Sequence, residues 1–267
     1  MQPTGEYKGE SYLQLLQLDS LFDETKYGYY CPRNLMIDQD DSAISNTQSS
    51  NYARIFSPDH YVCGWNNGPT GSYTAGCYNS DGLVSKTMEK IRKLYEGCDN
   101  LEAFQFFHST SGGTGSGLTT TIENKVKEEY PSIICANHTI FPYETSPAGS
   151  IEIYNTVFAI HGLVENCDLS FMYNNESLLT QCQSTPTYSH LNPSFTELNS
   201  IIAQQATNLT SSFRFPGTLN STFRKMAHNL IPFPRMHFLS LTHSNLQKRT
   251  ADKPNFFNMS TSEVIKA

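Results

Sequence analysis

Apolar and polar positions along the chain form two kinds of block that follow one another. Short apolar runs, which predict buried strands, lie at 34–38, 101–108, 132–140, 168–175 and 235–241. Segments in which apolar residues recur every three or four positions predict helices, and these lie at 82–97, 118–131, the later part of 146–167, and 196–213. Strands that alternate with helices indicate the α/β class. We therefore expect a doubly wound, mostly parallel sheet with helices on both faces.

The helical segments also predict which side chains form the core. Gly97 stands where a C-terminal cap belongs, and Pro131 ends the next helix. The side chains expected to point inward are Leu83, Val84, Met88, Ile91, Leu94, Leu118, Ile122, Val126, Leu198, Ile201, Ile202, Leu209 and Phe213.

Charge and composition exclude several classes of protein. The net charge is −7 and no cluster of Lys and Arg occurs, so we expect no nucleic-acid partner. The first residues are polar, and no stretch approaches the ~18 apolar residues of a membrane span, so none is expected. The seven cysteines are odd in number and form no CxxC pair. They indicate reduced thiols of a cytoplasmic protein, without a disulfide framework or zinc site.

The segment FFHSTSGGTGSGLTTT, residues 106–121, holds four of the chain's 16 glycines within six positions. It joins a predicted strand to a predicted helix. In a doubly wound sheet, a strand, a glycine-rich turn and a helix N-terminus form an anion site, because free amides and the helix dipole both point at a phosphate. The alternative is a tight turn that holds no ligand.

Three common glycine motifs do not fit this segment. A P-loop requires Gly-Lys-Ser/Thr, and GTGSGLT contains no lysine. The dinucleotide fingerprint requires GxGxxG and an acidic residue ~20 positions later, and neither is present. A nucleophile elbow requires GxSxG, which Ser116 does not satisfy.

The sequence HSTSGGTGSG resembles the signature loop HSxGGGTGSG of tubulins and their bacterial cell-division relatives. Other segments follow in the family's order, among them GYYCPRNLMIDQD, CDNLEAFQFFHS, HGLVENCD and NLIPFPRMHF. On these segments the chain is identified as a member of the tubulin family, most similar to its β branch.

The resemblance implies a tubulin-type GTP-binding domain over 1–195, the family's core helix over 196–214 and part of its intermediate domain over 215–267. Compared with the family pattern, this sequence begins after the first strand and its phosphate turn and stops before the C-terminal region. We therefore expect the GTP-binding domain and the intermediate domain both to be incomplete. In the family the first strand lies in the middle of the sheet. We therefore expect unpaired backbone groups on the two neighbouring strands.

The resemblance also assigns nucleotide-binding residues by matched position. The phosphate side comprises Ser109, Ser111, Gly112, Gly113, Thr114 and Gly115. Glu152 matches the acid that binds the ribose, Asn175 and Asn199 match amides that read the guanine edge, and Phe195 matches a stacking tyrosine. Asp40 matches the acid on the magnesium side. The alternatives are that Asn175 and Asn199 cap turns, Phe195 is core and Asp40 is a solvated loop acid.

Several positions depart from the family pattern and predict weak binding of GTP or GDP. Ser111 replaces the first glycine of the usual triplet, and Asp40 is one methylene shorter than the usual glutamate. The second phosphate loop appears as NGPTGSY, where Pro69 removes an amide donor. Ala148 replaces an aspartate that precedes the ribose acid.

No catalytic residue is expected. The family presents an acidic residue to the neighbouring subunit's nucleotide, whereas the matching segment NSTFRK, residues 220–225, contains no acid.

The sequence is consistent with three functions. The first is a β-tubulin-like, GTP-binding structural constituent of the cytoplasmic microtubule cytoskeleton, with other tubulin-like subunits as partners. The alternative is a non-catalytic subunit of another large assembly, axonemal or organellar, and the third is an independent GTPase.

Overall fold

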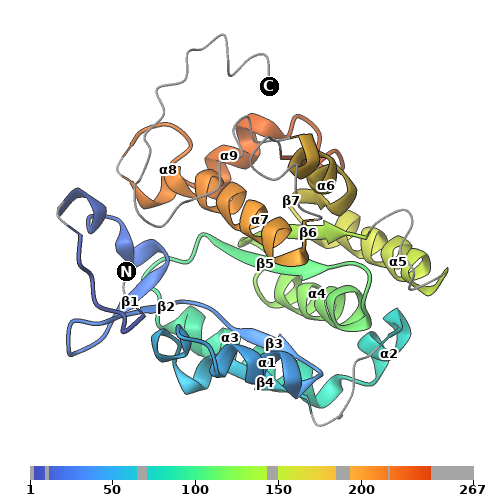
Figure 1. Ribbon diagram of the computed structural model, residues 1–267, viewed down its shortest axis with the longest axis horizontal. Coiled ribbons are helices and arrows are strands. Elements are labelled where there is room, and N and C mark those ends of the chain that lie inside the picture. The colour runs from blue at the N-terminus through green and yellow to red at the C-terminus, as the bar shows by residue number, and fades with distance from the viewer. Residues whose placement is uncertain are drawn as a thin grey trace.

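A computed structural model describes residues 3–9, 12–64, 71–142, 150–184, 193–215 and 217–241. Its largest sheet contains β5 (Ala103–Ser109), β6 (Ile134–Phe141), β7 (Leu169–Asn174) and β8 (Phe238–Ser240), in that order. Every neighbouring pair in this sheet is parallel. The predicted α/β class with a mostly parallel sheet is therefore confirmed (Figure 1).

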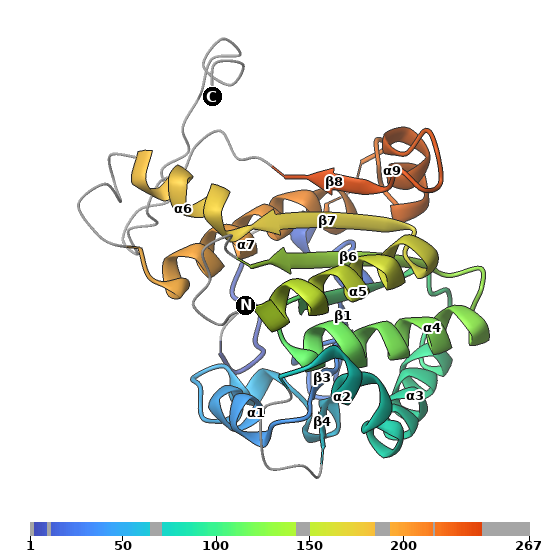
Figure 2. The same cartoon turned by 90° about the vertical axis from the view of Figure 1, so that its right-hand side faces the viewer.

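Helices cover both faces of this sheet, as the doubly wound prediction requires. Figure 2 shows α4 (Thr119–Glu129) and α5 (Ser150–Asn166) in front of the strands and α7 (Phe195–Leu209) behind them. Side chains of β6 alternate between the two layers. Ile134 and Ala136 pack in one hydrophobic cluster with α7, and Cys135 packs in the other with α4.

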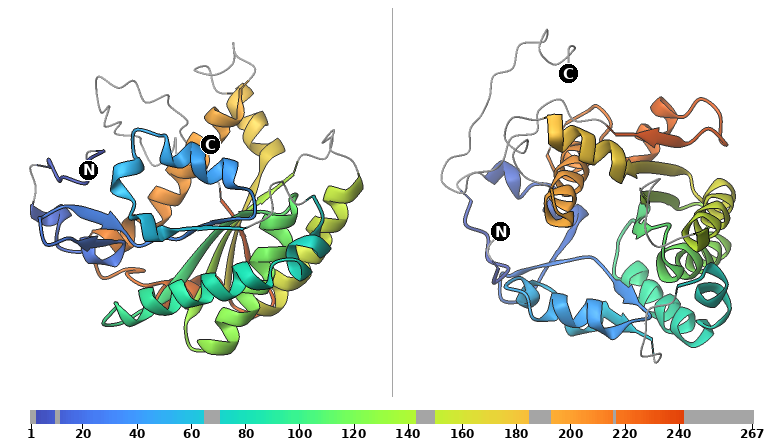
Figure 3. Two further views of the ribbon diagram at one scale, coloured as in Figure 1. Left: turned by 90° about the horizontal axis from the view of Figure 1, so that it is seen from below. Right: turned by 45° about the vertical axis from the view of Figure 1, so that its right-hand side comes forward.

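The remaining helices extend these layers, as two further views show (Figure 3). They are α1 (Asp41–Gln48), α2 (Tyr73–Tyr78), α3 (Asp81–Glu96), α6 (Asn175–Ser184), α8 (Ser211–Arg214) and α9 (Phe223–Leu230). Short 3-10 turns occupy Tyr12–Gln14, Leu18–Ser20, Ala53–Ile55 and Pro58–His60. The strands β1 (Phe22–Glu24) and β2 (Tyr30–Pro32) form a separate antiparallel pair.

Most of the predicted core is buried. Of the inward positions predicted on α3, α4 and α7, only Leu94 and Leu209 are half-buried rather than buried. Gly97 caps α3 as predicted, with a φ of −78° that any residue can adopt. The predicted helix 196–213 is wrong in one respect, because α7 ends at Leu209 and α8 begins after Thr210.

Thr210 explains this break in physical terms. Its hydroxyl donates to the carbonyl of Ala206 at 2.9 Å, and the Arg214 guanidinium donates to the carbonyl of Thr207 at 2.6 Å. Side chains therefore satisfy carbonyl groups in the last turn of α7, which lets the helix end there.

A second parallel pair, β3 (Met36–Asp38) and β4 (Tyr61–Cys63), is separate from the main sheet. Within the described residues, β3 pairs only with β4, and β5 pairs only with β6. The side chain of Phe107 on β5 is 62% exposed, whereas the first six residues of β6 are buried. Within the described residues, β3 and β5 thus belong to separate sheets.

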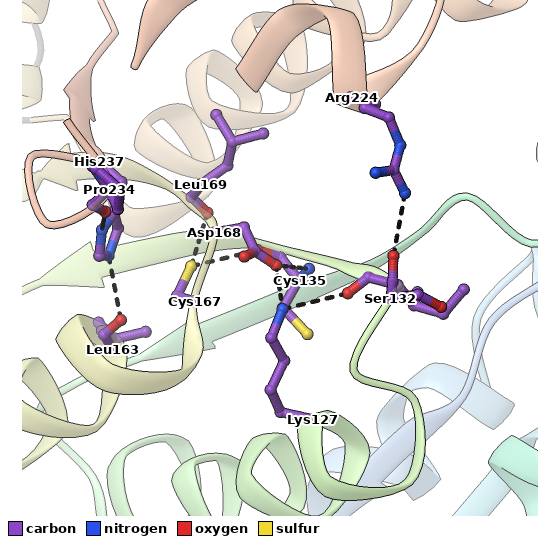
Figure 4. Close-up of polar contacts among 11 residues, drawn as sticks. Lys127, Ser132, Cys135, Leu163, Cys167, Asp168, Leu169, Arg224, Pro234 and His237 are labelled. Atoms are coloured by element: carbon purple, nitrogen blue, oxygen red, sulfur yellow. Dashed lines mark hydrogen bonds and ion pairs between the residues drawn. The ribbon is translucent and has the colours of Figure 1, made fainter. Parts of the chain in front are cut away.

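Polar contacts at the amino ends of β6 and β7 fix the helices to the strands (Figure 4). The Asp168 carboxylate accepts hydrogen bonds from the Cys135 amide at 2.9 Å and from Lys127 of α4 at 2.6 Å. Near β8, the two ring nitrogens of His237 contact the carbonyl oxygens of Pro234 and Leu163. The glycine-rich loop lies at the opposite, carboxyl edge of the strands, where it follows β5.

Candidate nucleotide-binding site

The glycine-rich loop leaves the carboxyl end of β5 and enters a helix directly. One turn of π-helix, Thr114–Leu118, begins after Gly113 and continues into α4. Gly112 is exposed, and the space where its Cβ would stand is open. The first amides of a helix have no partner within the helix, so this geometry leaves room for an anion at Gly112.

The other glycines of the segment have a packing role. A Cβ on Gly115 would overlap the carbonyl oxygen of Ser109, and a Cβ on Gly117 would overlap that of Tyr73. A Cβ on Gly76 of α2 would likewise overlap the carbonyl oxygen of Gly113. These glycines let three backbone segments approach each other. Gly76 was not predicted, because nothing in its local sequence indicates such a contact.

Two of the predicted hydroxyl groups meet at the start of the loop. Ser109 Oγ and Ser111 Oγ are 2.8 Å apart, and the Ser111 amide donates to Ser109 Oγ at 3.4 Å. The structure therefore brings Ser109 and Ser111 together beside Gly112. Ser111 remains half-buried in this position, with its carbonyl engaged from α5.

The His108 side chain connects the glycine-rich loop to β6. Its Nδ1 lies 2.7 Å from the carbonyl oxygen of Gly115, and its Nε2 lies 3.3 Å from the hydroxyl of Thr139 on β6. Burial lowers the pKa of His108 to about 4, so the ring is neutral at pH 7. A neutral ring with Nδ1–H donates to Gly115 and accepts from Thr139, which satisfies both nitrogens.

Asn155 of α5 is a site residue that the sequence analysis missed. Its side chain is 2% exposed and donates to the carbonyls of Ser111 at 2.8 Å and Gly71 at 3.0 Å. It also accepts a hydrogen bond from the Tyr73 amide at 2.8 Å. One amide thus joins α5, the phosphate loop and the segment that leads into α2. The signal in the sequence that could have indicated Asn155 is its position, one helical turn after Glu152.

Glu152 lies in the first turn of α5, next to this junction. Its carbonyl accepts from the Thr156 hydroxyl at 2.8 Å, and the same hydroxyl contacts that of Thr110 at 3.2 Å. Glu152 Oε2 is buried and has no hydrogen-bond partner among the described residues. A buried carboxylate oxygen without a protein partner suits a ligand hydroxyl.

The acidic residues after β3 have divided roles. Both oxygens of Asp40 bind Ser42, through its amide at 3.1 Å and its hydroxyl at 2.6 Å, so Asp40 caps α1. These hydrogen bonds lower the pKa of the Asp40 carboxyl. Asp38 instead contacts the phosphate loop, accepting from the Thr114 hydroxyl at 3.3 Å. Asp38 was not predicted, although it precedes Asp40 by only two positions.

The residues predicted on the base side lie farther along the same edge. Asn175 begins α6, directly after β7, and is half-buried. Ser109 at the end of β5 pairs with Ile140 of β6, and Ile140 pairs with Tyr173 of β7. The loop that follows β5 and Asn175, which follows β7, are therefore two strand spacings apart. That separation is about 10 Å, which a nucleoside phosphate spans. Phe195 and Asn199 are exposed on α7, which contacts α6.

Two positions that depart from the family pattern, Pro69 and Ala148, lie outside the described residues. The described part of the chain contains no group of three His, Cys, Asp or Glu side chains arranged to hold a metal ion. Its helices include none that is long and apolar enough to cross a membrane. All seven cysteines are free thiols.

The chain is an α/β protein with a parallel sheet. At the carboxyl edge of this sheet a glycine-rich loop enters a helix, which is the geometry of loops that bind phosphate, and acidic and amide side chains lie along the same edge. The family model Tubulin/FtsZ family, GTPase domain, matches residues 5–183. The chain therefore belongs to the Tubulin/FtsZ family.

The chain is also similar to a curated β-tubulin. It is 37% identical to "Tubulin beta chain" from Candida albicans over 246 residues, which cover 91% of this chain and 54% of the relative. The predicted resemblance to β-tubulin is thus confirmed. The chain spans about half the length of this relative.

Proposed function

We propose that the chain is a β-tubulin-like structural subunit that binds a guanine nucleotide weakly and does not hydrolyse it. The observation that carries this proposal is the open space at Gly112, at the start of a helix and beside the Ser109 and Ser111 hydroxyls. On the adjoining helix, Glu152 adds a buried carboxylate oxygen that has no partner among the described residues. Together they offer donors for phosphate oxygens and an acceptor for a ribose hydroxyl.

These residues fit a nucleoside phosphate in their chemistry. Amides of the loop from Gly112 to Gly115 and the two serine hydroxyls would donate to phosphate oxygens, and Glu152 would accept from the ribose. Asn175 and Asn199 would bind the guanine edge and Phe195 would stack on its face. A magnesium ion would be held from the β3 side, by Asp40 or by Asp38, which already contacts the loop.

The proposal of weak binding follows from a donor that the second phosphate loop lacks. Pro69 removes one amide donor from that loop. A charge-assisted hydrogen bond from an amide to phosphate contributes roughly 1.5–3 kcal/mol. The loss of one such bond therefore weakens binding by about tenfold or more.

The absence of hydrolysis is inferred from the segment at 220–225, which contains no acidic residue. In the structure Thr222 caps α9, and its hydroxyl accepts from the Lys225 amide at 3.2 Å. A hydroxyl in a helix cap cannot act as the general base that a water attack on phosphate requires. We propose that the chain assembles with other tubulin-like subunits in the cytoskeleton of the cytoplasm.

Calorimetric titration of the full chain with Mg·GTP and Mg·ATP, together with a phosphate-release assay, tests this function. We expect GTP to bind more tightly than ATP and no release above the uncatalysed rate. The variant Gly112→Ala should bind GTP roughly tenfold more weakly, because its methyl group enters the space that a phosphate oxygen would occupy. Gly82→Ala is the matched control, since Gly82 also faces open space but lies on α3.

Three results would contradict the proposal. They are equal binding of GTP and ATP, measurable turnover, and unchanged GTP affinity in Gly112→Ala. Native assemblies distinguish the two structural functions. Tubulin subunits co-purifying with the chain would support a microtubule role, whereas a complex without tubulin would support an axonemal or organellar assembly.

A further inference from the structure

A pocket separate from the phosphate loop lies at the carboxyl ends of β6, β7 and β8, next to α6 and α7. Figure 2 shows α6 beside these strand ends and α7 behind the sheet. Its volume is about 310 Å³, and its walls include Phe141, Leu178, Gln205, Ser240 and Leu241. This is at the lower end of the range of roughly 300–1,000 Å³ for small-molecule pockets. In the described chain, none of the residues assigned to the nucleotide lines it.

Gln205 is the unusual member of this lining. It lies on the inner face of α7 and is only 4% exposed. In the part of the chain that the structure describes, neither its amide nitrogen nor its amide oxygen has a hydrogen-bond partner. Buried polar groups in folded proteins are almost always paired, so a side chain with both atoms unpaired calls for a ligand.

The other walls restrict the chemistry of that ligand. None of the described lining residues carries an Asp, Glu, Lys, Arg or His side chain, so the pocket favours an uncharged molecule. The Tyr173 hydroxyl is already bonded to His138 Nδ1 at 2.8 Å, and Asn174 Oδ1 accepts from the Glu176 amide at 2.9 Å. The polar lining side chains also include Ser177, Gln181 and Ser240, and Gln205 is the one whose two amide atoms both have no partner within the described chain.

A primary carboxamide presents a donor and an acceptor side by side in one plane. The group that complements it through two hydrogen bonds has an N–H next to a C=O, as in a cyclic amide. We infer that this pocket binds an uncharged, planar molecule whose cyclic amide pairs with Gln205 and whose apolar body packs against Phe141, Leu178 and Leu241.

The inference is tested with quinolin-2(1H)-one and its N-methyl derivative as probes. The two compounds have nearly the same shape, but the N-methyl compound lacks the N–H donor. Binding to the full chain is measured by isothermal titration and by protein-observed NMR. We expect the N–H compound to bind at least tenfold more tightly than the N-methyl compound.

Two variants connect the effect to the pocket. Gln205→Leu should bind the two compounds within twofold of each other, whereas Gln204→Leu on the same helix should keep the tenfold preference. Ser240→Leu, which fills the pocket from β8, should abolish binding of the N–H compound and provides a second measurement if Gln205→Leu does not fold. Circular dichroism establishes that each variant is folded.

The inference is overturned by any of four results. The wild-type chain could bind both compounds equally, or bind neither at millimolar concentration. Gln205→Leu could retain the preference for the N–H compound, or Ser240→Leu could bind that compound as the wild type does. These outcomes can be distinguished from those of the GTP titrations, because none of the residues assigned to the nucleotide is among the described residues that line the pocket.

Discussion

Glu123 is the buried acid whose titration should control the pH dependence of stability. It lies on α4, is 1% exposed, and its Oε1 accepts from the side-chain amide of Asn137 at 2.6 Å. Its Oε2 has no partner among the described residues. Burial raises the pKa of Glu123 to about 8, and the hydrogen bond from Asn137 offsets only part of this effect.

The sign and size of the effect follow from the two pKa values. In the unfolded chain the Glu123 carboxyl titrates near its ordinary value of 4.5, whereas in the folded chain it stays protonated to about pH 8. The native state therefore binds more protons between these values, and the free energy of unfolding falls as pH rises, by about 1.4 kcal/mol per pH unit. From pH 5 to pH 8 this loss amounts to roughly 4 kcal/mol at most.

The substitution Glu123→Gln removes this titration and keeps an oxygen that can accept from Asn137. Urea unfolding at pH 5, 6, 7 and 8 should therefore show the variant gaining stability over the wild type at each step, most of all at pH 8. Glu128→Gln, at an exposed position of the same helix, serves as the control and should parallel the wild type. Parallel curves for Glu123→Gln and the wild type would refute the argument.

Three further outcomes are expected. Asn155→Ala should lower the free energy of unfolding by roughly 2–4 kcal/mol in urea titration, because the backbone groups of Gly71, Tyr73 and Ser111 lose a partner, whereas Asn166→Ala should cost less. Gly115→Ala should lower it by roughly 3 kcal/mol or more in the same assay, since its methyl group overlaps a carbonyl. Burial lowers the pKa of His138 to about 4, so the folded state binds this proton less readily than the unfolded state and the free energy of unfolding falls as pH drops from 6.5 to 4. His138→Phe should make this fall smaller. The same fall in the variant and the wild type would contradict the prediction.

The layered core could be predicted because its signal is local. The run at 132–140 is buried on both faces and became β6, and the spacing of Leu118, Ile122 and Val126 became the buried face of α4. Helix α6 was missed because only Leu178 and Cys182 mark its buried face, and one i, i+4 pair is too short a pattern. The end of α7 was missed because it depends on side-chain bonds from Thr210 and Arg214.

The site was predicted in part for the same reason. Ser109, Ser111 and the glycines are consecutive, so the motif alone indicates a loop between strand and helix. Asn155 and Asp38 reach that loop from positions 44 and 76 residues away, to Ser111 and Thr114 respectively. Such contacts depend on how α5 and β3 pack against the loop, which no local pattern of residues specifies.

The glycines of the loop show why a motif and a binding site are different observations. Gly115 and Gly117 are required by backbone contacts within the fold, and they would be required whether or not a phosphate binds. Gly112 is different, because no atom of the described residues lies where its side chain would be. Its backbone is not in the left-handed region either, so the open space at Gly112 supports our proposal that a phosphate binds there. The case for a nucleotide therefore depends on Gly112 and on the unpaired Glu152 oxygen, and much less on the number of glycines that match the family motif.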